Sequence, residues 1–390
     1  MATYKTELDY IKANADFVIH ALDVGGGDSI LIQTKGGKEN YLIDTGGGSE
    51  KSETLLWNAL QNYKVETLDK VIITHPHVDH DGNLPFLIKK EKEIAANKAS
   101  LEAAGKTYEG PKFSITQVYT NGIHISLSSS RQYQYEDYFT GLGRYSSLNT
   151  DSDPLTLDGS GSNSTTWTVL WPSKDFIGEM QERTNKHVAK YGNIADKADE
   201  GAAAESEFLQ ENSETYSINN SSIVGKLVRG NFSMLFTGDT GAKIWSNWID
   251  QSKLRSTVYK AAHHSQSSAN VGTVCKNKVK PYIVIITGGD HQNPYPHPGL
   301  QTWNKFVPRI ATVHRFYNCN VPIPRMWCTR QHGDIHIAFF GDEFTVYPSN
   351  QDYMWGQTWT NLMNRSIDLT DPTRGIYYEC DGTSLVTVRP

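Results

Sequence analysis

The densest group of residues able to do chemistry lies in the segment VIITHPHVDHDG, residues 71–82. An apolar run ends there in His75, His77, Asp79 and His80. Because side chains alternate along a strand, His75 and His77 are expected to point to one position, and the turn that follows aims Asp79 and His80 at a second. Imidazole nitrogens and carboxylate oxygens are the ligands of zinc and related cations. The spacing therefore predicts a metal centre rather than a turn with chance histidines.

Further candidate ligands follow other apolar runs. Asp239 closes the segment MLFTGD, where a carboxylate is suited to bridge two cations. His263 and His264 follow the segment VYKAA, and His263 is the preferred ligand because it comes first after the expected strand. Asp44 ends the run in YLIDTGGG, and we expect it to accept a hydrogen bond from a ligand histidine and so orient it.

Short β-branched runs and helix-like stretches alternate along the chain and must position these residues. The runs of strand length are 17–24, 29–33, 41–44, 71–74, 115–119, 167–171, 222–228, 233–237, 257–261, 282–287 and 334–340. The helix-like stretches are 52–63, 84–104, 242–249 and 298–306. Because the two kinds are interspersed, we predict an α/β or mixed α+β architecture.

Composition excludes several classes of protein. The 390 residues are 38% hydrophobic, which excludes a disordered chain. No run of about 18 apolar residues exists, and charges interrupt the N-terminal stretch where a signal peptide is apolar, so we expect a cytoplasmic protein with no membrane part. No cysteine pair has CxxC spacing, which argues against a cysteine zinc site; Cys319 and Cys328 are either paired across a loop or free.

The motifs resemble, in their order, those of the metallo-β-lactamase superfamily, and more closely the hydrolase domain of ComEC-type DNA-uptake proteins and its free-standing relatives. The segments that carry the resemblance are LDVGGGDSILIQ, LIDTG, ITHPHVDHDGNL, NNSSIVGKL, FTGD, KAAHHSQSS, GGDHQNPYPHP and TRQHGDIHI, within about residues 17–341. The resemblance implies a four-layer αββα sandwich with two divalent cations, zinc or manganese, at one sheet edge. The residues at matching metal positions are His75, His77, Asp79, His80, Asp239 and His263.

The resemblance also implies residues that act beside the metals. These are Asp79, Asp28 in GGGDS and His297 in NPYPHPG, although Asp28 is equally suited to a turn and His297 to capping a loop. The sequence departs from the family where WTVLWPS lacks the usual further metal-binding histidine. His124 and His187 are the histidines between HxHxDH and Asp239. We therefore expect one weak metal site, or one completed by water or His124.

We expect the chain to divide into a hydrolase domain at 1–349 and a C-terminal appendage at 350–390 that packs on it. Two insertions are expected in the domain: about 126–164, rich in Ser, Gly and Tyr without periodicity, and 173–217, a charged helix with an Ala- and Glu-rich centre.

Charge is segregated along the chain. Residues 251–330 carry eleven Lys and Arg against Asp290, a net +10 (11 − 1), whereas 173–218 carry ten acids and five bases. The basic stretch contains His263 and His297, which favours a phosphate-bearing substrate, either short nucleic acid or a small phosphodiester.

Two cations about 3.5–4 Å apart hydrolyse several kinds of bond through a metal-activated hydroxide. The expected activity is that of a nuclease or phosphodiesterase. The alternatives are a lactone or amide hydrolase of the same fold, and a degenerate, non-catalytic binding module.

Overall fold

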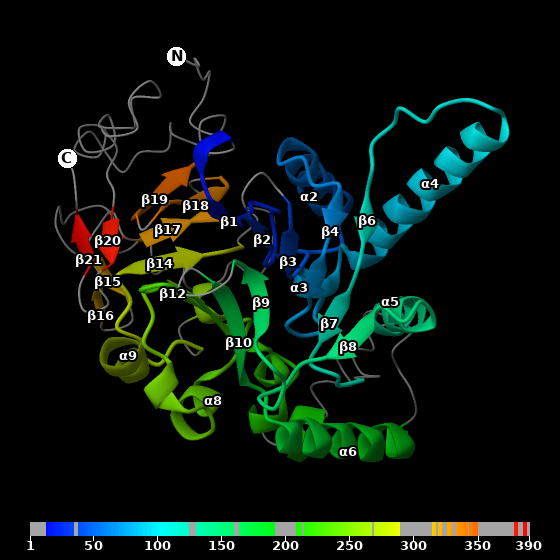
Figure 1. Cartoon of the computed structure of the whole chain (residues 1–390). Coiled ribbons are helices and arrows are strands. Elements are labelled where there is room, and N and C mark those ends of the chain that lie inside the picture. The colour runs from blue at the N-terminus through cyan, green and yellow to red at the C-terminus, as the bar shows by residue number, and fades with distance from the viewer. Residues whose placement is uncertain are drawn as a thin grey trace.

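Two β-sheets lie face to face at the centre of the molecule (Figure 1). The computed structural model describes residues 13–34, 38–124, 130–159, 164–191, 208–212, 214–266, 269–288, 314–316, 319–321, 326–329, 333–341, 343–349, 378–380 and 385–387. His297 and the predicted helix 298–306 lie outside these residues, as does most of the appendage.

The first sheet has ten strands in the order β21-β20-β19-β18-β1-β2-β3-β5-β7-β8. Strands β3, β5, β7 and β8 are parallel to one another, and the other pairs are antiparallel. The strands are β1 (Phe17–Ala21), β2 (Ile30–Thr34), β3 (Asn40–Ile43), β5 (Lys70–Ile72), β7 (Val118–Thr120), β8 (Tyr145–Ser147), β18 (Ile335–Phe340), β19 (Glu343–Pro348), β20 (Tyr378–Cys380) and β21 (Leu385–Thr387).

The second sheet has seven strands in the order β17-β14-β13-β12-β11-β10-β9, of which β12, β13, β14 and β17 are parallel. They are β9 (Leu155–Asp158), β10 (Thr165–Trp171), β11 (Val224–Arg229), β12 (Phe232–Phe236), β13 (Val258–Lys260), β14 (Ile283–Ile286) and β17 (Met326–Cys328). Two small pairs accompany the sheets: β4 (Thr67–Leu68) with β6 (Ser114–Ile115), and β15 (His314–Phe316) with β16 (Cys319–Val321).

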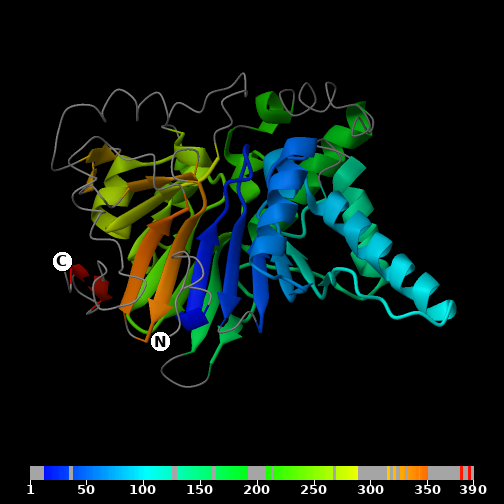
Figure 2. The same ribbon diagram turned by 90° about the horizontal axis from the view of Figure 1, so that it is seen from above.

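Helices cover the outer faces of both sheets. They are α2 (Glu50–Asn62), α3 (Val78–Asp81), α4 (Leu84–Ala103), α5 (Ser130–Gly141), α6 (Lys174–Tyr191), α8 (Ala242–Asn247) and α9 (Gly272–Val274). Helix α2 begins where the Ser49 hydroxyl accepts from the Ser52 N–H at 3.2 Å, satisfying a free donor of the first turn. Figure 2 shows α4 extending from the body of the molecule as an arm.

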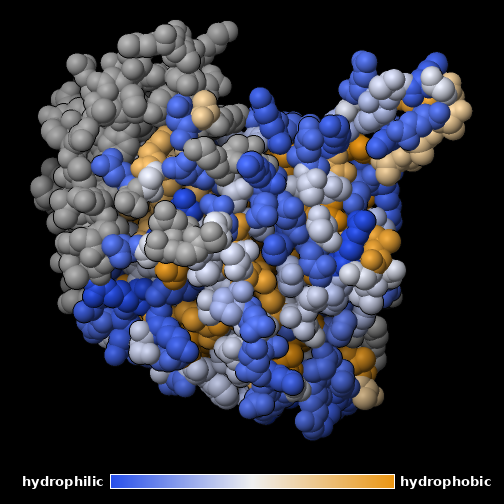
Figure 3. Space-filling view, viewed as in Figure 1, coloured by the Kyte–Doolittle hydropathy of each residue, from blue (hydrophilic) through white to orange (hydrophobic). Residues whose placement is uncertain are grey.

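Three apolar clusters hold the layers together. Phe17, Trp167 and Met234 belong to the cluster between the sheets. A second cluster joins the ten-stranded sheet to α2, α4 and α5, and a third joins the seven-stranded sheet to α6 and α8. The predicted αββα sandwich is therefore confirmed. On the face shown in Figure 3, the coloured surface is mostly hydrophilic, which agrees with helices that turn their apolar sides inward.

Most elements lie where the sequence placed them. Each of the eleven apolar runs overlaps a strand, and three of the four helix-like stretches overlap α2, α4 and α8. The segment 126–164, expected as an aperiodic insertion, contains α5 and adds β8 to one sheet and β9 to the other. Strands β20 and β21 extend the first sheet from within 350–390. In the part of the chain that the structure describes, no helix is long and apolar enough to cross a membrane.

Candidate metal centre

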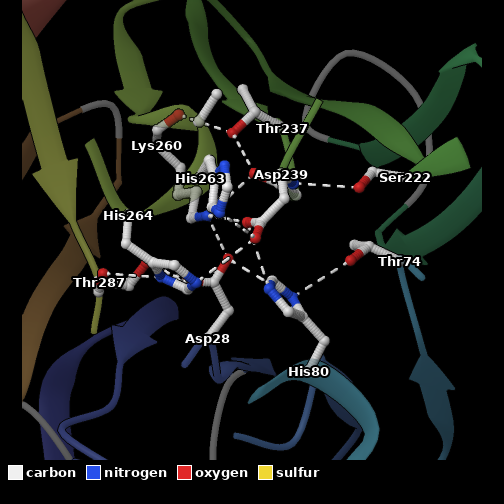
Figure 4. A network of polar contacts seen from close by, with 12 residues as sticks. Asp28, Thr74, His80, Ser222, Thr237, Asp239, Lys260, His263, His264 and Thr287 are labelled. Atoms are coloured by element: carbon white, nitrogen blue, oxygen red, sulfur yellow. Dashed lines mark hydrogen bonds and ion pairs between the residues drawn. The ribbon is translucent and has the colours of Figure 1, made fainter. Parts of the chain in front are cut away.

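Four side chains from segments that follow parallel strands meet at one edge of the sandwich. Asp79 and His80 lie in α3 after β5, Asp239 follows β12, and His264 follows β13. One ligand atom from each lies within 4.8 Å of the other three. The His80 Nε2 atom is 3.2 Å from Asp239 Oδ1, and His264 Nε2 is 3.1 Å from Asp79 Oδ2. Figure 4 shows His80 and His264 converging on Asp239.

Asp44 orients His80 from behind. Its Oδ2 atom accepts from His80 Nδ1 at 2.8 Å, while the Thr74 N–H and hydroxyl donate to the two carboxylate oxygens at 2.7 and 2.8 Å. The predicted contact between Asp44 and a histidine of the motif is confirmed. Because Nδ1 is engaged by the carboxylate, His80 presents Nε2 to the centre.

Asp28 takes the same position behind His264. Its Oδ1 atom lies 3.1 Å from His264 Nδ1, and the carboxylate also contacts Lys260 and the Thr287 hydroxyl. The family resemblance implied that Asp28 acts beside the metals, and the structure buries it at 2% exposure with the contacts of a residue that orients His264. Gly27 makes this loop fit, because a Cβ there would lie 1.9 Å from the carbonyl oxygen of Asp79.

The backbone after β13 brings both histidines of the HH pair toward Asp239. His263 and His264 have φ values of 49° and 48°, in the left-handed region that non-glycine residues rarely adopt. The Asn270 side chain secures the turn by bonding the N–H and carbonyl of Ala262 at 3.1 and 2.9 Å. Such strain persists only where the surroundings fix it.

The four-residue group contains His264 and not His263, which the sequence preferred. His263 is nearby, with Nε2 3.6 Å from Asp239 Oδ2 and a side chain 22% exposed. The left-handed turn carries the second histidine, His264, inward, and the preference for His263 stays a prediction. Asp79, with a side chain 33% exposed, and His263 lie on the more open side of the centre.

His75 and His77 form a separate pair beside this group. His75 Nε2 and His77 Nδ1 lie 3.1 Å apart, as expected for two rings that face one position. On the other side of the ring, His75 Nδ1 contacts the Ser222 hydroxyl at 3.1 Å, and that hydroxyl accepts from the Asp239 N–H at 3.0 Å. Ser222 was not predicted from the sequence, where its signal was the NNSSIVGKL segment that leads into β11.

No third His, Cys, Asp or Glu joins His75 and His77 in a comparably close group within the described residues. His124, considered above as a replacement, contacts Glu136 at 2.5 Å. His187, on α6, contacts Glu211 at 3.1 Å. The two halves of the predicted binuclear centre therefore differ in their protein ligands.

The electrostatics of the four-residue group suit a cation. Burial alone would raise the pKa of Asp239, but the charges of His80, His264 and His263 hold it well below its usual value. Burial lowers the pKa of His264, but Asp239 and Asp28 outweigh it and raise that pKa to about 10. His80 Nε2 and Asp239 Oδ1 are buried, and neither makes a well-formed hydrogen bond. A divalent cation fits these atoms, because it would replace the protons that now balance the carboxylates.

Comparison with known proteins matches the N-terminal part of the chain. Residues 22–154, which include the HxHxDH segment, match the family model of the metallo-beta-lactamase superfamily. The chain has the metallo-beta-lactamase fold. No curated protein matches the sequence.

Solved structures of the metallo-beta-lactamase fold are similar at low sequence identity. The fold protein YhfI from Bacillus subtilis is 13% identical, with 69% of this chain and 85% of that chain covered and a TM-score of 0.35. A diphosphatase from the PhnP family is 10% identical, with 83% and 98% covered and a TM-score of 0.38. Neither likeness bears on the reaction of this chain.

Proposed function

We propose that this protein is a divalent-metal-dependent hydrolase that uses zinc or manganese. The observation that carries the proposal is the group of Asp79, His80, Asp239 and His264, in which the two histidines each have a buried carboxylate on Nδ1. Such carboxylate–histidine pairs are the usual support of metal ligands. A purely structural cluster would have no reason to leave both Nε2 atoms facing two further carboxylates.

The residues of the centre would divide the work as follows. Asp44 and Asp28 fix the rings of His80 and His264, and Asp239 lies between them as the shared carboxylate. A bound divalent cation supplies Lewis acidity, which polarises the scissile group and makes water more acidic. Asp79 and His263 border the more open side, so the substrate approaches past these two side chains.

We further propose a phosphodiester as the substrate class. The support is the net charge of +10 (11 − 1) over 251–330 and the resemblance of the motifs to the ComEC-type hydrolase domain. Phosphate oxygens carry the charge that divalent cations and basic residues bind best. One alternative is a lactone or amide substrate, which would use the same metal chemistry. The other is a non-catalytic binding module, which is favoured by the lack of a close third ligand for His75 and His77 among the described residues.

A metal and activity assay decides among these. The purified chain is expected to hold at least one zinc or manganese by elemental analysis and to hydrolyse bis-p-nitrophenyl phosphate faster than a small lactone. Asp239→Asn is expected to abolish turnover, whereas Asp153→Asn, at an exposed carboxylate, serves as the matched control. Binding of less than one cation per chain at saturating metal would refute the proposal. Faster turnover of the lactone would indicate a carboxylic ester and not a phosphodiester as the substrate class. Bound metal without turnover of either substrate would favour the binding module.

A further inference from the structure

Lys260 is among the largest fully buried side chains, at 1% exposure, beside the metal centre. Its Nζ atom forms an ion pair with Asp28, donates to the Gly238 carbonyl at 3.2 Å, and lies 4.0 Å from Asp239 Oδ1 (Figure 4). A buried ammonium is costly unless it is paired and hydrogen-bonded. Lys260 meets both conditions through Asp28 and through Gly238, the residue before Asp239.

The two orienting carboxylates differ in what holds them. Asp44 accepts hydrogen bonds from two uncharged donors, the N–H and the hydroxyl of Thr74. Asp28 accepts a hydrogen bond from the Thr287 hydroxyl and forms an ion pair with the ammonium of Lys260. The contacts therefore run from Lys260 through Asp28 to His264, parallel to those from Thr74 through Asp44 to His80.

This arrangement bears on a second group of possible ligands. Asp28, Asp44 and His80 also lie close enough together to hold a cation. The ammonium lies against Asp28 and contributes the positive charge that a metal ion would bring there. Because the ammonium of Lys260 already balances Asp28, the divalent cation is expected on the other side of the rings, at the Nε2 atoms of His80 and His264.

We propose that Lys260 is a positioning residue: it fixes Asp28 as the acceptor for His264 Nδ1 and so makes His264 a metal ligand. The inference deepens the proposed function and depends on its metal site. It removes Lys260 from the set of basic residues that contact substrate, because the side chain is buried and its ammonium is engaged.

The test compares zinc affinity across a double-mutant cycle. Lys260→Met, Asp28→Asn and the combined variant are titrated with zinc against a chromogenic chelator, and the cobalt forms are compared by visible absorption. Lys260→Met leaves an uncompensated buried carboxylate, so the combined variant, which removes both charges, is the folded reference. Lys98→Met, at a lysine 59% exposed on α4, is the control.

We expect Asp28→Asn and the combined variant to bind zinc about 10- to 100-fold more weakly than wild type, with altered cobalt bands, because an orienting partner of a metal ligand is lost. Adding Lys260→Met to Asp28→Asn is expected to cause little further loss, since both act through His264. Wild-type affinity in the combined variant would overturn the inference and leave the pair as a contribution to folding alone.

Two further results keep the outcomes distinct. If the combined variant does not fold, Asp28→Asn alone decides, because unchanged zinc affinity there shows that Asp28 does not orient His264. If wild type itself binds no zinc, cobalt or manganese, the proposed function fails. Metal binding that is equal in wild type and variants refutes the orienting roles of Asp28 and Lys260 and leaves the proposed metal site standing.

Discussion

Each histidine of the four-residue group has a buried carboxylate of its own on Nδ1: Asp44 for His80 and Asp28 for His264. The tautomer and ring orientation are therefore set by folding before any cation arrives. Preorganisation of this kind raises affinity because little side-chain freedom remains to be lost on binding. His263 contacts Asp239 from the more open side, and it is not part of the close group.

This difference predicts unequal effects of two neighbouring substitutions. His264→Ala is expected to weaken zinc binding by at least about 100-fold, because it removes a ligand and leaves Asp28 and Asp79 without their shared partner. His263→Ala is expected to weaken it by less than about 10-fold. Chelator competition measures both, and the reverse order of effects would restore the preference for His263 that the sequence suggested.

The His75–His77 pair leads to a second prediction at the residue scale. Since no third His, Cys, Asp or Glu of the described residues lies as close to His75 and His77 as the four ligands lie to one another, a cation at this pair should be bound at least about 10-fold more weakly than one at the four-residue group. Equilibrium dialysis should show one tight cation and one weaker. The double change His75→Ala, His77→Ala should remove the weaker one and leave the tight one; two equal sites in wild type would contradict this.

The metal-binding residue types were predictable from sequence, whereas their partners were not. HxHxDH and TGD are local patterns, so His80 and Asp239 could be named directly. Ser222 contacts His75 across 147 positions, and no spacing rule connects them. The choice between His263 and His264 depends on positive φ values, which sequence order does not reveal.

Among the elements, the central strands were readable because they are apolar and β-branched. Strands β8 and β9 were missed, since edge strands are short and need fewer apolar residues. Within the segment that contains them, Glu136 of α5 accepts from the Tyr145 hydroxyl of β8 at 2.8 Å, and Glu136 also contacts His124, just before the segment, at 2.5 Å. The segment 126–164 thus takes part in both sheets.

The His124–Glu136 contact predicts a pH-dependent contribution to stability. The hydrogen bond to Glu136 raises the pKa of His124 above its usual value of 6.5. The stabilisation is therefore complete below about pH 6.5 and is lost as pH rises through the raised pKa of the folded state. His124→Gln should lower the free energy of unfolding more at pH 5.5 than at pH 9. The difference should stay below about 1 kcal/mol, because His124 is half exposed.

Urea unfolding at the two pH values measures this difference. Lys98→Met is again a suitable control, because its partner Glu102 lies on the exposed arm of α4. An equal loss at both pH values would show that His124 contributes through packing and not through charge.

For the whole molecule, the position of the basic residues matters more than their number. Three exposed lysines lie before the strands that lead to the metal centre: Lys253 precedes β13, and Lys278 and Lys280 precede β14. The metal centre lies at the opposite ends of these strands, where the strands finish. Thr287 comes seven positions after Lys280 (287 − 280), which is about 23 Å of extended chain. This exceeds the Debye length of about 8 Å at physiological ionic strength, so these lysines have little influence at the centre.

If the basic segment binds phosphate, the part that follows Gly288 must do so, because the chain leaves β14 next to His264. We therefore predict that reversing Lys305 and Arg309 to Glu lowers kcat/KM on an oligonucleotide about 5- to 30-fold at low salt, and less as salt rises. The expectation for these two residues, which lie outside the described ranges, rests on sequence order.

The matched reversal, Lys278→Glu with Lys280→Glu, should change kcat/KM by less than about 2-fold. Circular dichroism checks that both variants fold, and a lactone serves as the uncharged substrate. Equal losses from the two reversals would indicate a diffuse field, and no loss from either would remove the charge argument for a phosphodiester substrate.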